Sequence, residues 1–255
     1  MQYALISDIH SNLPALDAVL ADIDRRGITA IYHLGDLVGY SAGPNEVVAR
    51  LIERAIPGVS GNYDSTVASD YKHCGCRSEN ARQEELSHVS YEWTRKHVTP
   101  ATKSFLGALP FRIDLRPLGG HVAGPTITLV HATPVNNLVY VTEDRPDAFL
   151  TKMANQAQLE GGDAICFGHT HKPWHRVVDG IVFVNTGSVG RPKDGDWRAG
   201  YVLLDVGEGE ARVEVVRVEY DVERAARGIL ESDLPPDFAD YLRTGGRVTS
   251  ATVAR

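Results

Sequence analysis

Short apolar segments recur along the 255-residue chain, and each one runs into polar side chains of the kind that bind metal ions. The segments cover residues 3–6, 30–34, the neighbourhood of Val59, 127–130 and 164–167. Longer segments between them, such as residues 13–26 and 45–54, repeat apolar side chains every three or four positions, which is typical of helices. This alternation predicts parallel strands inside a layered α/β fold.

The remaining segments extend this prediction over most of the chain. We expect a strand over residues 181–184, a hairpin over 201–220, and helices over 146–159, 222–230 and 236–243. Residues 66–110 break the alternation because they are polar, with helical stretches around 79–97 and 100–109. We therefore predict a single domain over residues 1–246 with a helical insertion or lid at about 66–110, followed by a disordered tail over 247–255.

Composition limits the partners of such a domain. Hydrophobic residues make up 43% and charged residues 23% of the chain, as in ordinary globular enzymes. The formal net charge is −7, and an acidic chain is a poor generic binder of nucleic acid, whose affinity for proteins depends on many Lys and Arg contacts. No apolar stretch is long enough to cross a membrane. We expect no membrane partner and no obvious nucleic-acid-binding surface.

The cysteines indicate the compartment. There are three, and an odd number argues against a disulfide framework. Cys74 and Cys76 form a C-x-C pair, but no second pair completes a zinc site, so we predict that both are free thiols. Together with the lack of a basic, apolar leader at the N-terminus, this predicts a cytoplasmic protein.

The polar residues after the apolar segments form the candidate site. In open α/β sheets, ligands bind beyond the carboxyl ends of the strands, so these residues can converge on one crevice. Asp8 has an alternative role as the cap of the helix near residue 13, and His33, inside a strand, is predicted as a core residue or a neighbour of the ligands. The candidate ligands are Asp8, His10, Asp36, Asn62, His131, His169 and His171.

This ligand set predicts the kind of metal centre. Oxygen and imidazole ligands without thiolate suit manganese, iron or zinc. Seven ligands exceed the need of one tetrahedral ion, so two ions that share a carboxylate are the natural arrangement. Two ions roughly 3.5–4 Å apart can hold both the attacking hydroxide and the phosphoryl oxygens of an in-line displacement.

The ordered motifs D-x-H, G-D, G-N-x-D, H and G-H-x-H resemble those of the calcineurin-like metallophosphoesterases, and NTGSVGRPKDGD at residues 185–196 is similar to the small bacterial and archaeal phosphodiesterase branch. The resemblance implies a four-layer αββα sandwich. It implies that the first metal is held by Asp8, His10, Asp36 and His171. It implies that the second is held by Asp36 as a bridge together with Asn62, His131 and His169.

Further residues near these motifs are candidates for catalysis and substrate binding. Many family members carry histidine where this chain has Tyr63, and a tyrosine with a pKa of about 10 is a weaker match to neutral pH as a proton donor. We therefore predict a preference for good leaving groups, with packing as the alternative role of Tyr63. Tyr63 and Asp64 are the candidate catalytic residues. Asn62 and Arg191 are the candidate substrate contacts, although Arg191 could instead pair with a nearby aspartate, Asp194 or Asp196.

The function that we predict is that of a phosphodiesterase with two divalent ions, Mn²⁺ before Fe or Zn, in which a bridging hydroxide attacks phosphorus. Its substrate would be a small phosphate ester or anhydride, most simply a nucleotide. The alternatives are a phosphomonoesterase or nucleotidase, a dinucleoside polyphosphate hydrolase, and a non-catalytic protein-binding scaffold. The sequence leaves the oligomeric state open.

Overall fold

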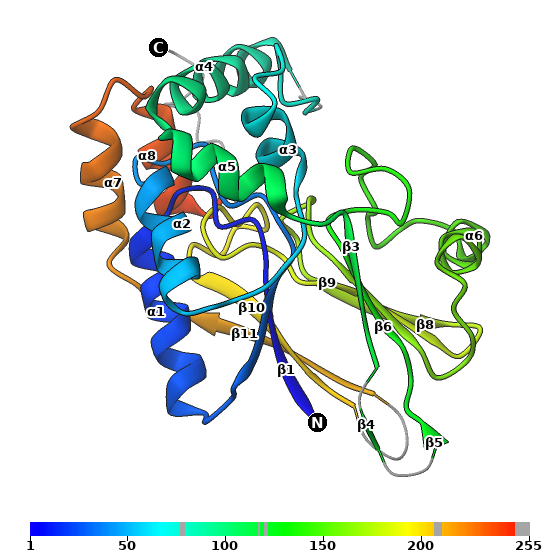
Figure 1. The fold of residues 1–255 in the computed structure, drawn as a ribbon. Coiled ribbons are helices and arrows are strands. Elements are labelled where there is room, and N and C mark those ends of the chain that lie inside the picture. Colours follow the sequence, from blue (N-terminus) through cyan, green and yellow to red (C-terminus); the bar gives the residue numbers. More distant parts are fainter. Residues whose placement is uncertain (77–79, 117, 120–121, 207–210, 248–255) are drawn as a thin grey trace.

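Two β-sheets packed face to face form the centre of the computed structural model (Figure 1), which describes residues 1–76, 80–116, 118–119, 122–206 and 211–247. The first sheet has the order β11 (Arg212–Val218), β10 (Ala199–Asp205), β1 (Gln2–Ile6), β2 (Ala30–His33). The second has the order β3 (Arg112–Leu115), β6 (Ile127–Val130), β7 (Ala164–Phe167), β9 (Ile181–Asn185), β8 (Trp174–Val178). A small ribbon pairs β4 (Leu118–Gly119) with β5 (Val122–Ala123).

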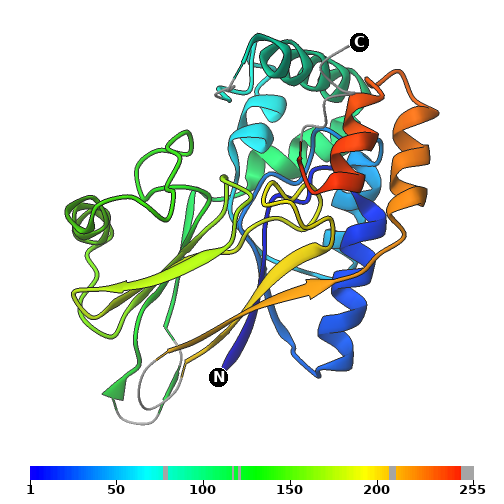
Figure 2. The ribbon, with the colours of Figure 1, turned by 180° about the vertical axis from the view of Figure 1, so that it is seen from behind.

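Helices cover the outer face of each sheet. On the first sheet lie α1 (Leu13–Arg25), α2 (Pro44–Glu53) and α7 (Val222–Leu230), seen from behind in Figure 2. On the second lies α6 (Asp147–Ala157). The remaining helices gather at the end of the sheets where β1 and β2 finish (Figure 1): α3 (Asn62–Ala68), α4 (Ala81–His97), α5 (Pro100–Ala108) and α8 (Asp237–Thr244).

Alternation along the strands explains these layers. In β1, Tyr3 and Leu5 belong to the core between the two sheets, whereas Ala4 and Ile6 pack with the helices. In β7, Ala164 and Cys166 face the same inter-sheet core and their neighbours face α6. Because both faces of these central strands are buried, their sequences read as continuous apolar runs. The predicted four-layer αββα sandwich is confirmed.

Three local features differ from the expected elements. The strand expected near Val59 is reduced to a single bridge between His33 and Gly58, because Pro57 cannot donate to a ladder and glycine weakens a strand. The edge strands β3 and β8 were not predicted, since their side chains are only partly buried and lack a clear apolar pattern. Helix α3 replaces the turn expected at Gly61 and Asn62.

The segment expected to be an insertion holds α4 and α5, and α5 packs against α3. Of the expected tail, residues 248–255 lie outside the described residues. None of the helices in the described ranges combines the length and the apolar character needed to cross a membrane.

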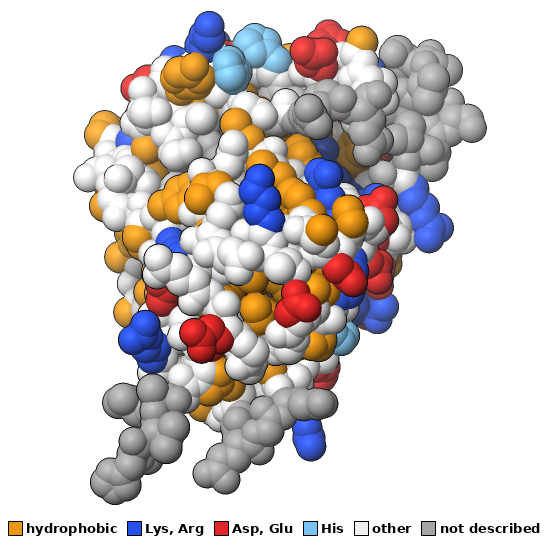
Figure 3. All heavy atoms as spheres, turned by 90° about the vertical axis from the view of Figure 1, so that its right-hand side faces the viewer, with side chains coloured by type: hydrophobic (Ala, Val, Ile, Leu, Met, Phe, Trp, Pro, Cys, Tyr) orange, Lys and Arg blue, Asp and Glu red, His pale blue; other side chains and the backbone are white. Residues whose placement is uncertain are grey.

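On the face shown in Figure 3, the basic and acidic side chains of the described residues are interspersed with hydrophobic and uncharged ones.

His33 is a buried histidine that links the fold to pH. Its side chain is fully buried, and neither ring nitrogen has a hydrogen-bond partner among the described residues. The ring lies against Gly58, where an added Cβ would come within 2.3 Å of Nδ1. Burial alone lowers the pKa of His33 to about 3. The folded chain therefore favours the neutral ring, whereas the unfolded chain protonates it below a pH of about 6.5.

We expect the His33→Leu variant to lose stability less steeply than the wild type as the pH falls. As the pH drops from about 6.5 towards 3, the unfolded chain binds a proton at His33 that the folded chain does not. This lowers the free energy of unfolding by about 2 kcal/mol at pH 5. Denaturant unfolding at about pH 7.5 and 5, with chelator present, measures the difference. The exposed His175→Gln variant is the control and should follow the wild type. Parallel curves for His33→Leu and the wild type would contradict the assignment.

Candidate metal centre

Two groups of buried side chains at the carboxyl ends of the strands can each hold a cation. The first group is Asp8, His10 and His171, and the second is Asp36, His131 and His169. Within each group the ligand atoms lie within 4.8 Å of one another. Loops after β1 and β2 of the first sheet and after β6 and β7 of the second supply all six residues. The structure thus brings together the strand ends that the sequence predicted would converge.

Asp36 belongs to the second group and also lies close to the first. Its Oδ2 is 3.7 Å from Nε2 of His10 in the first group and 3.6 Å from Nε2 of His131 in the second. Its other oxygen, Oδ1, accepts the backbone N–H of Tyr63 at 2.9 Å. One carboxylate oxygen is therefore placed where a ligand shared by two ions would be.

Hydrogen bonds to backbone carbonyls orient three of the imidazoles. Nδ1 of His10, His131 and His171 lies 3.0, 2.8 and 2.6 Å from the carbonyl oxygens of Val38, Leu34 and Arg191. A carbonyl oxygen only accepts, so Nδ1 carries the proton and Nε2 is left with its lone pair. Nε2 of His10 and of His171 are 3.2 Å apart. Two lone pairs at this distance repel unless a cation lies between them.

The remaining ligand atoms also lie where a cation could bind them. Buried Oδ1 of Asp8 has no hydrogen-bond partner among the described residues and lies 3.2 Å from Nε2 of His171. In the second group, Nδ1 of His169 and Oδ1 of Asn62 each lie 3.1 Å from Nε2 of His131. A buried cluster of oxygen and imidazole donors suits a divalent transition metal. The residues fit two ions.

The pKa shifts of His10, His171 and Asp8 favour the forms that bind a metal ion. Burial lowers the pKa of His171 to about 4 and that of His10 well below its usual value. Burial opposes ionisation of Asp8, but His171 and the other histidines beside it hold its pKa below the usual range. Burial raises the pKa of Asp36 to about 7, against the opposing effect of His131. A bound cation would keep this carboxylate ionised.

Most of the ligands adopt an unusual backbone conformation. Five of the seven candidate ligands have positive φ angles between 47° and 67°: Asp8, His10, Asp36, His169 and His171. For a residue with a Cβ this left-handed region costs roughly 1–2 kcal/mol. Such strain clusters at functional sites, where the surrounding fold enforces it. Here it turns successive ligands of the D-x-H and H-x-H motifs into one site.

Two glycines let the motif loops approach the carboxylates. A Cβ on Gly61 would lie 2.1 Å from Oδ1 of Asp36, and one on Gly168 would lie 2.3 Å from Oδ2 of Asp8. The glycines of G-N-x-D and G-H-x-H are therefore required by close packing around the site.

Hydrogen bonds show the roles of Asn12 and Asp64 in the loops around the site. The alternative role of Asp8 as a helix cap is wrong, because Asn12 caps α1 by accepting the N–H of Ala15. The two oxygens of buried Asp64 accept the N–H groups of Leu37 and Gly61, each at 2.9 Å. Asp64 thus ties the G-D loop to α3, and its catalytic role stays a prediction.

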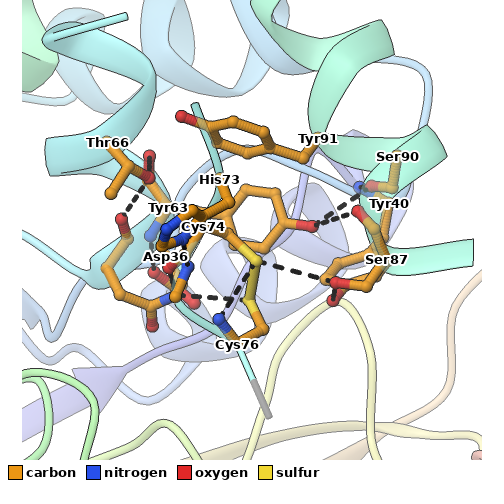
Figure 4. The surroundings of a disulfide bond; sticks show 12 residues. Asp36, Tyr40, Tyr63, Thr66, His73, Cys74, Cys76, Ser87, Ser90 and Tyr91 are labelled. Carbon is orange, nitrogen blue, oxygen red and sulfur yellow. Dashed lines mark hydrogen bonds between the residues drawn. A yellow bond between two sulfur atoms is a disulfide. The ribbon is translucent and has the colours of Figure 1, made fainter. Parts of the chain in front are cut away.

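Tyr63 is fully buried beside the first group, with its ring 5.6 Å from that of His10. Its hydroxyl lies 3.4 Å from Oγ of Ser90 and 3.5 Å from the carbonyl of Ser87, both on α4 (Figure 4). Burial raises its pKa well above the ordinary value. This geometry favours the packing role, and proton donation by Tyr63 stays a prediction.

The prediction that Cys74 and Cys76 are free thiols is wrong, because the two form a disulfide (Figure 4). Gly75 between them has φ of 73°, a conformation natural to glycine, and the two Cα atoms are 5.3 Å apart. This separation lies within the range that disulfides span. The bond is local and needs no framework of further cysteines.

Arg191 reaches the site without pairing with the aspartates near it. Asp194 pairs with Arg217 and Asp196 with Arg198. The Arg191 guanidinium instead lies 4.0 Å from the ring centroid of Tyr40 and 5.0 Å from that of Tyr241. Its buried Nε has no hydrogen-bond partner among the described residues.

Tyr40 and Tyr241 were not predicted from the sequence. No motif surrounds either residue, and Tyr241 lies on α8, far along the chain from the ligands. Both line a cavity of about 500 Å³, together with Arg191 and the ligands His10, Asp36, His169 and His171. Residues of α4 and α8 wall this cavity, and the pair Arg82–Asp237 joins these two helices.

The chain is similar to known proteins in sequence and in fold. The family model described as the calcineurin-like phosphoesterase superfamily domain matches residues 1–209. An uncharacterized protein of Methanocaldococcus jannaschii is 33% identical over 263 aligned positions, which cover 95% of this chain and 97% of that protein.

Two solved structures superpose on nearly the whole chain. A metallophosphoesterase from Sphaerobacter thermophilus has 26% identity and a TM-score of 0.73, covering 96% of this chain and 99% of its own. A hypothetical protein from Pyrococcus horikoshii has 21% identity and a TM-score of 0.79, covering 97% and 99%. The second likeness supports the fold.

We expect the Asp36→Asn variant to bind fewer metal ions than the wild type. An amide carries no negative charge and is a poor bridge between two cations, so the second ion should be lost first. Equilibrium dialysis against Mn²⁺ followed by elemental analysis gives the number of ions per chain. The exposed Asp144→Asn variant is the matched control. Unchanged metal content in Asp36→Asn would show that Asp36 is not shared.

Proposed function

The chain belongs to the calcineurin-like phosphoesterase superfamily, and we propose that it is a dinuclear-metal phosphodiesterase acting on small nucleotide-type phosphate esters or anhydrides. The observation that supports this proposal is the pair of buried ligand groups, joined through Asp36, beside a cavity that Arg191 also lines. Phosphoester hydrolysis is the chemistry of the superfamily, whereas the diester preference and the nucleotide are our proposal.

Manganese is the metal that we propose first, with iron and zinc as alternatives. The donors are carboxylates, imidazoles and one amide oxygen, and this set contains no thiolate. When bound, the two ions would supply charge neutralisation at the phosphoryl group and a nucleophile at neutral pH. The first would be held by Asp8, His10, Asp36 and His171, and the second by Asp36, Asn62, His131 and His169.

Arg191 supports phosphate binding. Its guanidinium contacts the rings of Tyr40 and Tyr241, and its buried Nε has no hydrogen-bond partner among the described residues. A planar guanidinium binds two oxygens of a phosphate at once. Its own carbonyl accepts from Nδ1 of His171, so the residue is anchored directly beside the first ligand group.

The walls of the cavity support a small substrate. Residues of α4 and α8 line it, and its volume of about 500 Å³ is of the size that takes a small molecule. Together with the net charge of −7, this favours a nucleotide over a nucleic acid or a protein.

The ligand set and Tyr63 bear on the alternative functions. Every ligand position of the superfamily motifs is filled, which favours an enzyme over a non-catalytic scaffold. The position at which many members carry histidine holds Tyr63, whose hydroxyl is directed to α4. A site without an evident proton donor favours substrates with stable leaving groups, such as nucleotides and nitrophenolates, over alkoxides.

The first experiment is hydrolysis of bis(p-nitrophenyl) phosphate and p-nitrophenyl phosphate with and without Mn²⁺. We expect turnover that depends on the metal and is faster on the diester. Both esters release nitrophenolate, which needs no proton from the enzyme, so the comparison does not depend on Tyr63. Faster turnover of the monoester would favour the phosphomonoesterase or nucleotidase. Absence of turnover of both esters with Mn²⁺, Fe²⁺, Zn²⁺ and Mg²⁺ would favour the scaffold.

We expect the Arg191→Met variant to bind phosphate esters about tenfold more weakly or worse, because a charge-assisted contact contributes more than about 1.5 kcal/mol. The measurement is KM for the diester and the inhibition constant of orthophosphate at saturating Mn²⁺. Arg198→Met, which removes an arginine paired with Asp196, is the matched control. Equal inhibition constants for Arg191→Met and the wild type would remove Arg191 from the substrate contacts.

A further inference from the structure

We propose that the Cys74–Cys76 pair is a redox modification site whose state sets the affinity of the second metal position through Asn62. The proposal rests on the proposed function in one respect, the role of Asn62 as a ligand of the second ion. Cys74 and Cys76 lie in the segment between α3 and α4, and Cys76 lines the cavity.

The amide of Asn62 connects the disulfide to the metal position. Its Oδ1 lies 3.1 Å from Nε2 of His131, inside the second ligand group. Its Nδ2 donates to the carbonyl of Cys74 at 3.1 Å and to Sγ of Cys76 at 3.5 Å. Only the oxygen end of an amide binds a metal cation, so these two donations select the orientation that presents oxygen to the ion.

The disulfide fixes both of the acceptors that Asn62 uses. The Cys74 carbonyl and Cys76 Sγ belong to one small ring closed by the bond, so their relative positions depend on it. Cys74 is also held from the other side, since its Sγ lies 3.6 Å from Oγ of Ser87 on α4 (Figure 4). Reduction opens the ring, and the two sulfur atoms must separate. Because Cys74 is packed under α4, the displacement falls on Cys76 at the cavity wall.

Exposure gives the two sulfur atoms different roles in thiol–disulfide exchange. Cys76 is half-buried and lines the cavity, whereas Cys74 is buried.

In the reduced chain, the Cys76 thiolate attacks a small-molecule disulfide of the glutathione type, and one thiol leaves with a proton. The Cys74 thiolate then attacks the Cys76 sulfur and releases the second thiol. The two protein thiols lose two electrons and two protons, and the small disulfide becomes two thiols. A small thiol reverses both steps.

The consequence is a metal site that responds to the thiol pool. In the oxidised chain, Asn62 is held with its oxygen towards the second group. In the reduced chain one of its two partners moves, and the amide is free to turn. Losing a partner that orients a ligand typically weakens metal binding by about 10-fold or more. The first group, made of Asp8, His10 and His171, has no contact of this kind with the two cysteines among the described residues.

The test is Mn²⁺ binding by titration calorimetry on the full chain in both redox states. The oxidised sample is equilibrated with glutathione disulfide, the reduced sample with a phosphine reductant that is then removed, and mass spectrometry confirms the loss of two hydrogens on oxidation. We expect the weaker of two binding events to have a dissociation constant about tenfold higher in the reduced sample, with the tighter event unchanged.

Two variants make the result specific. The Cys74→Ser, Cys76→Ser double variant should give the weaker isotherm under both treatments. Cys166→Ala, which removes the buried free thiol of β7, should respond to the treatments as the wild type does. A redox difference that persists in the double variant would overturn the proposal.

Identical isotherms for the oxidised and reduced wild type, or failure of the pair to form a disulfide with glutathione disulfide, would also overturn it. Calorimetry needs no turnover, so this outcome is distinct from failure of the proposed phosphodiesterase activity. A chain that binds Mn²⁺ in a redox-dependent way but cleaves neither nitrophenyl ester would keep this inference and lose that function.

Discussion

Electrostatic repulsion inside a buried cluster of ligands is the constraint on which the rest of the structure depends. Two buried carboxylates and several imidazole lone pairs converge there, and such a cluster is costly unless cations neutralise it. The cost is increased by the left-handed backbone at most of the ligands. The large double-sheet core holds these loops in place, because each ligand directly follows or lies close to a buried strand end.

The same features show how much of this protein could be predicted from its sequence. Parallel strands are buried on both faces, so their apolar runs were visible, and the polar residues at their carboxyl ends followed from sheet geometry. That is why Asp8, Asp36 and His131 were expected to converge. The division of the ligands between two metal positions, with Asp36 as the shared ligand, was implied by the resemblance to the family. The distances from Asp36 to His10 and His131 fit this division.

What could not be predicted depends on contacts between distant or irregular segments. The contact between Arg191 and Tyr241 joins a loop to a helix fifty residues further along the chain, and no local sequence pattern predicts it. The Cys74–Cys76 disulfide was not predicted because the number of cysteines indicates only whether several disulfides can form a framework. A disulfide within a C-G-C turn forms between near neighbours and needs no other cysteines. The edge strands β3 and β8 are half-exposed and so lack the apolar signal that identified the central strands.

The division of ligands between the two sheets has a mechanical consequence. Asp8 and His10 follow β1 of the first sheet, while His171 follows β7 of the second, and the other group is split in the same way between Asp36 and the pair His131 and His169. Each bound ion would therefore cross-link the two halves of the sandwich at one end of their interface. Metal loading then acts on the whole fold, because ions that bind only the docked sheets shift the folding equilibrium by mass action. A chain of this design couples its own lifetime to the supply of metal.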